Sequence, residues 1–330
     1  MTKTNWRVVT SPSALRHGLF GQIALFIFEV LPKLYQNQIY PDWKITSLVY
    51  GFEPDFTVVP GIFDLSYETK ATQTKDIDLM DLRLHFVSVL GNQWDALHNL
   101  WNEYFSIPLR TVERANAFGD LSHAIGLHYR GTDKNSDLDA TNPVAYDDFL
   151  TLIDDFINNH EDIDTIFVAS DEYSIKQAIK ANYRDKRIIE TGEVGAYASV
   201  ERNTYEKGDQ AVLDCLLLSR CKYLIKNQSA LSGFAKVFNP KIEAYRIAAS
   251  KLFTDIPYFP DAYIPSLRSD SPKCKAILKR LLSDDWTENK KAWQKFGKGF
   301  ISMERRSLKW KVERARYQFS RMKLARSHTI

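Results

Sequence analysis

Apolar and polar positions along the chain change from an irregular to a regular arrangement near residue 120. The segments 123–129 (H-A-I-G-L-H-Y) and 164–171 (D-T-I-F-V-A-S-D) are short apolar runs typical of buried strands, and 146–159 carries apolar residues at helical spacing. Helices are then expected at 174–183, 209–219 and 232–238, and strands at 186–191 and 222–227. This alternation predicts parallel β-α-β units and hence a doubly wound α/β sheet.

The first 115 residues give weaker signals. Gly18 and Gly21 predict a tight loop, and residues 23–34 predict a buried helix that ends near Pro32. Strands are expected at 45–51 and 56–60, and a helix at 80–105. We therefore predict an N-terminal lobe over 1–115, a second lobe over 116–287 and a tail over 288–330.

Polar residues follow three of the expected strands. Arg130, Asp171 and the pair Gln228-Ser229 all lie at carboxyl ends, which is where ligands bind to sheets of this type. Arg130 offers a charged fork suited to phosphate, and the backbone amides of 131–134 can approach an anion. These features predict a phosphate-bearing ligand. The chain lacks the G-x-G-x-x-G and G-x-x-x-x-G-K-[ST] loops, which argues against a dinucleotide oxidoreductase and a P-loop ATPase.

Three stretches carry a resemblance to a known family. They read I-G-L-H-Y-R-G-T-D-K (125–134), I-F-V-A-S-D-E (166–172) and A-V-L-D-C-L-L-L-S-R-C-K-Y-L-I-K-N-Q-S (211–229). In this order they resemble the donor-site motifs of the α-1,6-fucosyltransferases, which include the nodulation and N-glycan core enzymes of the GDP-fucose transferase superfamily. The resemblance covers about residues 120–240.

The resemblance implies a fold and a reaction. The fold would be GT-B, with two Rossmann-like lobes facing a cleft, the donor nucleotide on the second lobe and the acceptor on the first. The reaction would move fucose from GDP-fucose, with inversion and without a metal or other cofactor, to a glycan or lipid-linked oligosaccharide. Two alternatives stay open: another nucleotide sugar on the same scaffold, or a catalytically silent module that binds a nucleotide or carbohydrate.

Individual residues can be matched to the family motifs. Arg130 matches the arginine that grips the donor β-phosphate, and His128 and Asp214 match positions that contact the guanine. The full set expected to contact the donor nucleotide is His128, Arg130, Gly131, Asp171, Asp214, Gln228 and Ser229. Gly18, Gly21, Asp133 and Lys134 are candidates for acceptor or phosphate contacts.

Structural roles compete with these assignments. His128 shares a strand face with Arg130 and could be a packed core residue. Asp171 and Glu172 could simply cap the helix that begins near Ser174. Asp214 lies within the apolar run V-L-D-C-L-L-L, where an unpaired carboxylate would be costly, so we expect it to have a partner or a ligand.

The sequence departs from the family at two points. The α-1,6 enzymes carry two adjacent arginines where this chain has Arg130 and Gly131, so the sugar and the linkage stay open. The residue aligned with the family's proposed base is Leu138, which leaves Asp137 and Asp139 as displaced candidates. Other carboxylates that could take the acceptor proton are Asp133 and Glu29.

Charge is distributed unevenly. From residue 288 onward 13 Lys and Arg stand against 3 Asp and Glu, whereas the preceding residues carry 31 against 38. Apolar side chains of this tail recur at helical spacing, at Leu308, Val312, Ala315, Phe319 and Met322. The tail over 300–330 is thus expected either to bind an anionic membrane surface or to fold back on the acidic body.

Location and the remaining partners follow from simple features. The three cysteines suggest neither a disulfide framework nor a zinc site, and the N-terminus lacks the apolar core of a signal peptide. We therefore expect a cytoplasmic protein, peripheral at the inner membrane face if the tail binds lipid. No nucleic-acid partner is expected.

Overall fold

A computed structural model of the chain describes most of residues 93–283 and short parts of the rest. The described residues are 5–9, 20–21, 23, 42–43, 63–66, 74–78, 93–131, 142–192, 204–249, 260–283, 285 and 287. The strands predicted at 45–51 and 56–60 and the tail 288–330 lie outside them, as does nearly all of the helix predicted at 23–34.

A parallel five-stranded sheet in the order β10-β9-β6-β7-β8 is the main feature of the described chain. The strands are β6 (Ala124–Tyr129), β7 (Thr165–Ser170), β8 (Arg187–Ile189), β9 (Tyr223–Lys226) and β10 (Glu243–Arg246). The chain adds β7 and β8 on one side of β6 and then β9 and β10 on the other. The predicted doubly wound α/β sheet is therefore confirmed, and β10 is an additional strand that the pattern did not predict.

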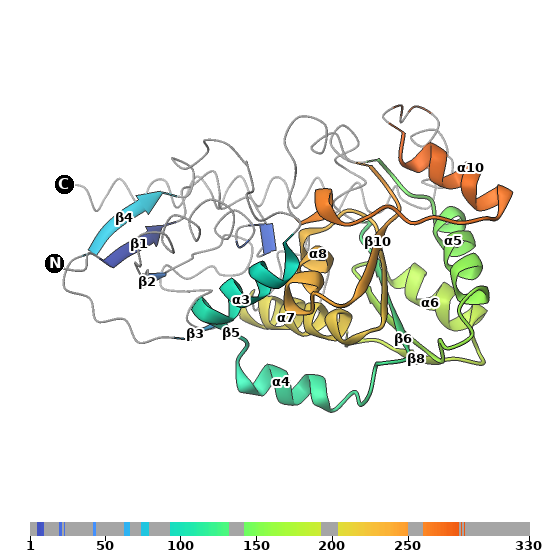
Figure 1. The fold of residues 1–330 in the computed structure, drawn as a ribbon. Coiled ribbons are helices and arrows are strands. Elements are labelled where there is room, and N and C mark those ends of the chain that lie inside the picture. The colour runs from blue at the N-terminus through green and yellow to red at the C-terminus, as the bar shows by residue number, and fades with distance from the viewer. Residues whose placement is uncertain are drawn as a thin grey trace, which may run out of the picture.

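Helices cover both faces of this sheet (Figure 1). The elements are α5 (Tyr146–Asn158), α6 (Tyr173–Asn182) and α10 (Pro272–Leu281) on one face, and α7 (Thr204–Arg220) and α8 (Ala230–Phe238) on the other. Alternation along β6 separates the two cores: Leu127 packs with α5 and α6, whereas Ala124 packs with α7 and α8. Both faces of the three inner strands β6, β7 and β9 are buried because apolar residues run almost unbroken along them.

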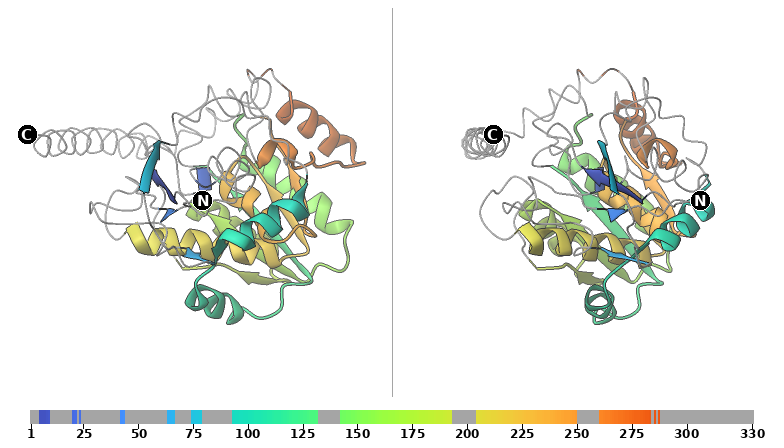
Figure 2. Two further views of the ribbon diagram at one scale, coloured as in Figure 1. Left: turned by 60° about the vertical axis from the view of Figure 1, so that its left-hand side comes forward. Right: turned by 90° about the vertical axis from the view of Figure 1, so that its left-hand side faces the viewer.

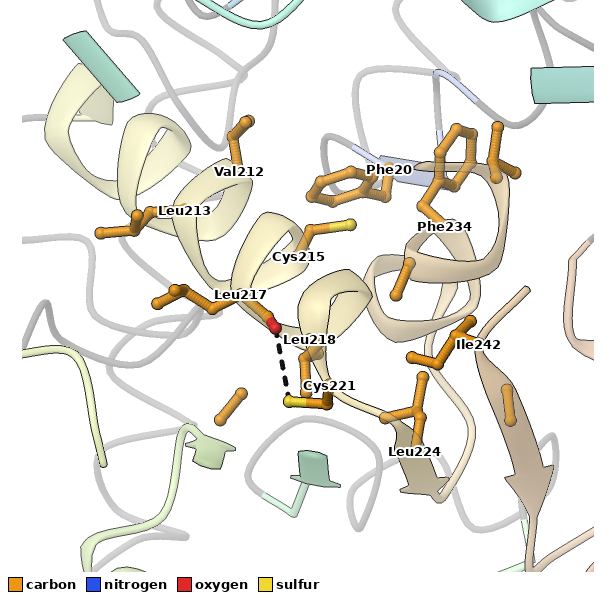
Figure 3. Close-up of a cluster of buried hydrophobic side chains, with 14 of the residues drawn as sticks. Phe20, Val212, Leu213, Cys215, Leu217, Leu218, Cys221, Leu224, Phe234 and Ile242 are labelled. Atoms are coloured by element: carbon orange, nitrogen blue, oxygen red, sulfur yellow. Dashed lines mark hydrogen bonds between the residues drawn. The ribbon is translucent and has the colours of Figure 1, made fainter. Parts of the chain in front are cut away.

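The close approach of α7 to the sheet depends on Gly126. A Cβ atom at this position would lie 2.9 Å from Leu218 Cδ2 and 3.3 Å from Cys221 Sγ. Figure 3 shows the cluster that fills this face, in which the Cys221 thiol donates a hydrogen bond to the Leu217 carbonyl (3.4 Å). Cys215, Cys221 and Cys274 are all buried and free.

The N-terminal part contributes a smaller parallel sheet, which Figures 1 and 2 show apart from the five-stranded one. Its order is β2-β1-β4, and a separate antiparallel pair joins β3 to β5. The strands are β1 (Asn5–Val9), β2 (Asp42–Trp43), β3 (Asp64–Leu65), β4 (Thr74–Asp78) and β5 (Phe105–Ser106). The predicted domain boundaries and a Rossmann-like fold for the N-terminal lobe stay predictions.

Helix α3 (Trp94–Tyr104) lies before the boundary predicted between 115 and 116, and α4 (Leu109–Asn116) crosses it. The two helices pack on α8 and α7 respectively. The Phe20 ring likewise lies 5.4 Å from that of Phe234 on α8. The tight loop predicted at Gly21 is wrong for that residue, which is helical because Phe20 and Ile23 beside it are buried in the same core. Among the described residues, no helix is long and apolar enough to cross a membrane.

Candidate functional site

The chain reverses its direction across the sheet between β6 and β9, and Arg130 and Asn227 follow these two strands. Asn227 Oδ1 accepts a hydrogen bond from the Arg130 backbone N–H (3.0 Å), and its Nδ2 donates to the Arg130 carbonyl (2.8 Å). One buried side chain thus satisfies both backbone groups of Arg130. Ligands bind to doubly wound sheets at this reversal point, so the bonds fix Arg130 where a ligand is expected.

Asn227 is a site residue that the sequence reasoning missed. The third motif was interpreted through its neighbours Gln228 and Ser229, although the Asn227 amide also offers both a donor and an acceptor at the end of β9. Its position directly after a buried strand was the available signal.

The β7 side holds the same backbone from the other direction. Asp171 Oδ1 accepts a hydrogen bond from the Gly131 N–H (3.1 Å). Ser170 Oγ donates to the Tyr129 carbonyl (2.6 Å) and accepts from the Glu172 N–H (3.1 Å). The Gly131 amide that the sequence assigned to an anion is therefore donated to Asp171, and Asp171 is not the N-cap of α6, which is Glu172.

Arg130 therefore projects from a backbone that is held on both sides. Its residue is half-buried, in contrast to the fully buried strand that precedes it. A guanidinium on a fixed backbone loses less conformational freedom when it binds a phosphate, and its planar fork suits two phosphate oxygens. The phosphate contact expected for Arg130 from the sequence stays a prediction.

Glu172 turns its side chain into the protein rather than into solvent. The residue is 1% exposed, and neither carboxylate oxygen has a hydrogen-bond partner of ordinary geometry among the described residues. A Cβ atom at Gly131 would lie only 1.7 Å from Glu172 Oε1, so this carboxyl rests directly on the Gly131 backbone. Burial raises the pKa of Glu172 to about 7, and the Ser174 hydroxyl opposes the shift only in part.

The predicted residues of the third motif are engaged within the protein. Gln228 Nε2 donates to the Ala249 carbonyl, and the Ser229 N–H donates to Asp261 Oδ2 (2.8 Å). Asp261 also pairs with Lys226 at the end of β9, with 2.5 Å between Nζ and Oδ1. Gln228 and Ser229 therefore connect the end of β9 to later segments of the chain.

Asp214 has the partners that its apolar surroundings led us to expect. Its Oδ1 accepts hydrogen bonds from the Thr191 hydroxyl, just beyond β8, and from Gln210 Nε2 (3.0 Å). Burial raises the pKa of Asp214, and the bonds from Thr191 and Gln210 oppose this. Gln210 Oε1 in turn accepts from Arg114 of α4 (3.2 Å), so α4 supports this end of the site.

Of the remaining predicted site residues, only His128 lies in the described part of the chain. His128 is buried and, by strand alternation, lies on the face of the sheet that Ala124 shares with α7 and α8. Gly18, Glu29, Asp133, Lys134, Asp137 and Asp139 lie outside the described residues. In the described part of the chain, no group of three His, Cys, Asp or Glu side chains is placed to hold a metal ion.

Comparisons with known proteins give structural similarities only. No protein-family model matches the sequence, and no curated protein matches it. The fucosyltransferase NodZ from Bradyrhizobium is similar over 72% of this chain and 94% of its own, with 14% identity and a TM-score of 0.45.

Two other solved structures are similar to about the same extent. Arabidopsis thaliana FUT1, solved with GDP, has 11% identity and a TM-score of 0.44 over 74% of this chain and 71% of its own. POFUT1, also solved with GDP, has 12% identity and a TM-score of 0.41 over 72% of this chain and 95% of its own. The chain is thus similar in structure to the fucosyltransferases that its motifs resemble.

Proposed function

We propose that the protein is an inverting glycosyltransferase that moves a sugar from a nucleoside diphosphate to a hydroxyl of a glycan or glycolipid, with GDP-fucose as the donor. The observation that supports this most is the fixation of Arg130 at the reversal point of the sheet, by Asn227 on one side and through Gly131 by Asp171 on the other. The choice of fucose as the sugar and guanine as the nucleobase follows the resemblance of the three motifs.

The chemistry of glycosyl transfer accounts for this arrangement. The bond between the sugar and the diphosphate breaks with its electron pair moving to the diphosphate, so negative charge grows on the phosphate next to the sugar. A positive group that is already in position stabilises that charge without having to reorganise. Arg130, on its fixed backbone, is that group.

Asp214 supplies the second part of the proposed donor site. Thr191 and Gln210 both donate to its Oδ1, which fixes the orientation of the carboxylate beyond the end of β8. A carboxylate fixed in this way can accept hydrogen bonds from the N–H groups of guanine. We propose that the guanine base of the donor lies toward β8 and that its phosphates lie toward β6.

A second candidate function is the same reaction with another nucleotide sugar. The observation that favours it is the contact between Glu172 and Gly131, because the carboxyl fills the space that a side chain at position 131 would need. The second arginine of the α-1,6 enzymes cannot be accommodated there unless Glu172 moves. The glycine at position 131 is therefore consistent with the position of the Glu172 carboxyl beside it.

A nucleotide panel separates these functions. Melting temperatures are measured with GDP, UDP, ADP and CMP for the wild type and for Arg130→Ala. A rise with GDP that is lost in Arg130→Ala supports the proposal, and a rise with UDP alone favours the second candidate. Binding of GDP without release of GDP from any GDP-sugar would refute a transferase and leave a binding module.

A further inference from the structure

We propose that Glu172 is the catalytic base, the group that takes the proton from the acceptor hydroxyl as the new glycosidic bond forms. This inference rests on the proposed function and names a residue for a role that Asp133, Asp137, Asp139 and Glu29 had left open. The inference rests on the position of the Glu172 side chain, on its burial, and on the absence of a well-aligned hydrogen bond to its carboxylate among the described residues.

The β7–α6 turn places two adjacent acids in different roles. Asp171 uses Oδ1 to hold the Gly131 N–H (3.1 Å), which is a structural contact. Ser170 accepts the Glu172 N–H (3.1 Å), and the Glu172 side chain turns inward. Neither oxygen of Glu172 has a hydrogen-bond partner of ordinary geometry among the described residues, and only the Ser174 hydroxyl lies near enough to influence the carboxyl.

Gly131 lets this carboxyl come close to Arg130. Because position 131 has no side chain, Glu172 Oε1 lies where a Cβ atom would otherwise be, against the backbone of the residue that follows Arg130. The proposal places the reacting carbon of a sugar whose diphosphate binds Arg130 on this side of the turn. Glu172 is thus on the correct edge of the sheet and next to the correct residue.

A buried carboxyl without partners is rare in folded proteins because burial without a hydrogen bond is costly. Such groups are found at sites where a substrate completes the hydrogen bonding or where a proton is exchanged. Burial is the main influence on the pKa of Glu172, which is about 7, and no charged side chain of the described residues contributes to it. Proton uptake is most efficient when the pKa of the base lies near the working pH.

The step balances without a further reactant. The acceptor oxygen bonds to the anomeric carbon of the sugar, and the bond from that carbon to the diphosphate oxygen breaks with its electron pair. The hydroxyl proton moves to a Glu172 oxygen, while Arg130 stabilises the charge on the departing diphosphate. Glu172 then releases the proton to solvent.

The test measures release of GDP from GDP-fucose, with and without an added glycan mixture, since water can replace the acceptor and needs the same base. We expect Glu172→Gln to lower kcat by about 100-fold or more while GDP binds within about threefold of its wild-type affinity. Wild-type kcat should fall below pH 7 and this dependence should disappear in Glu172→Gln. Formate should restore part of the turnover of Glu172→Ala.

Controls separate the possible failures. Glu161→Gln changes an exposed carboxyl outside the site and should leave kcat unchanged, and thermal unfolding checks that each Glu172 variant is folded. A wild type that releases no GDP from any GDP-sugar contradicts the proposed function itself. An active wild type whose Glu172→Gln variant keeps kcat and the same pH profile overturns the base alone.

Discussion

At the scale of single residues, Asn227 contributes through its hydrogen bonds to the backbone of Arg130. Replacing it with Ala leaves a partly buried N–H and a partly buried carbonyl without this partner, and each such loss costs about 1–3 kcal/mol. We expect Asn227→Ala to lower the free energy of unfolding by about 2 kcal/mol or more, measured in urea. Asn182→Ala, at an exposed helix end, should change it by less than about 0.5 kcal/mol. Equal stabilities of the two variants would show that the backbone of Arg130 is not held in this way.

Glu172 predicts a pH dependence of stability that does not depend on any enzymatic activity. Its folded-state pKa of about 7 lies above its ordinary value of 4.5, so folding favours the protonated form. The stability it contributes is complete below about pH 4.5 and is lost as the pH rises through 7. Relative to the wild type, the free energy of unfolding of Glu172→Gln should be little higher at pH 5 and higher by about 3 kcal/mol at pH 8.

Urea unfolding between pH 5 and pH 8 measures this difference. Glu161→Gln is the matched control, because the Glu161 side chain is exposed. The free energy of unfolding of this variant should differ from that of the wild type by the same amount at pH 5 and pH 8. A gain for Glu172→Gln that is the same at pH 5 and pH 8 would mean that the Glu172 carboxyl does not change its protonation in this range.

At the scale of elements, the 3-10 helix η3 (Asp261–Tyr263) is attached to the end of β9 by a buried ion pair. Lys226 and Asp261 are 0% and 1% exposed, and burial lowers the pKa of Lys226 while Asp261 opposes that shift. Removing one charge leaves the other buried without compensation, so Asp261→Asn should destabilise the protein by about 3–5 kcal/mol. The exposed pair of Lys275 and Asp270 provides the control, and Asp270→Asn should cost less than about 1 kcal/mol.

Chemical denaturation of the two variants makes the comparison. The expected loss in Asp261→Asn also includes the hydrogen bond from the Ser229 N–H, which begins the connection into α8. A cost for Asp261→Asn no larger than that for Asp270→Asn would contradict an attachment of η3 through this pair.

Most elements of the five-stranded sheet could be predicted because their apolar patterns are long and regular. The α7 helix begins at Thr204 rather than at the predicted 209 because Asp209 lies inside it and binds Thr111 of α4 (2.8 Å). A polar residue such as Asp209 indicates a helix end only if no neighbouring helix supplies its hydrogen-bond partner. The α4 sequence L-R-T-V-E-R-A-N buries only Thr111 and Ala115, which is too weak a pattern to predict.

At the scale of the whole molecule, one rule of topology predicted where the candidate site lies. Parallel strands bring their carboxyl ends to one edge, so Arg130 and Asp171 could be assigned to a single site from their places after β6 and β7. Their partners could not be assigned in the same way. Asn227 reaches Arg130 across 97 positions of sequence, and whether Glu172 faces solvent or Gly131 depends on the geometry of a turn.

Calorimetric titration of GDP at pH 7 tests the central claim, that Arg130 at the reversal point of the sheet binds the diphosphate of a donor. We predict saturable binding to the wild type, a loss of affinity of at least about tenfold in Arg130→Ala, and unchanged binding in Arg184→Ala, which removes an exposed arginine outside the site. Equal affinity for GDP in Arg130→Ala and the wild type, or no binding of GDP to the wild type, would contradict the account.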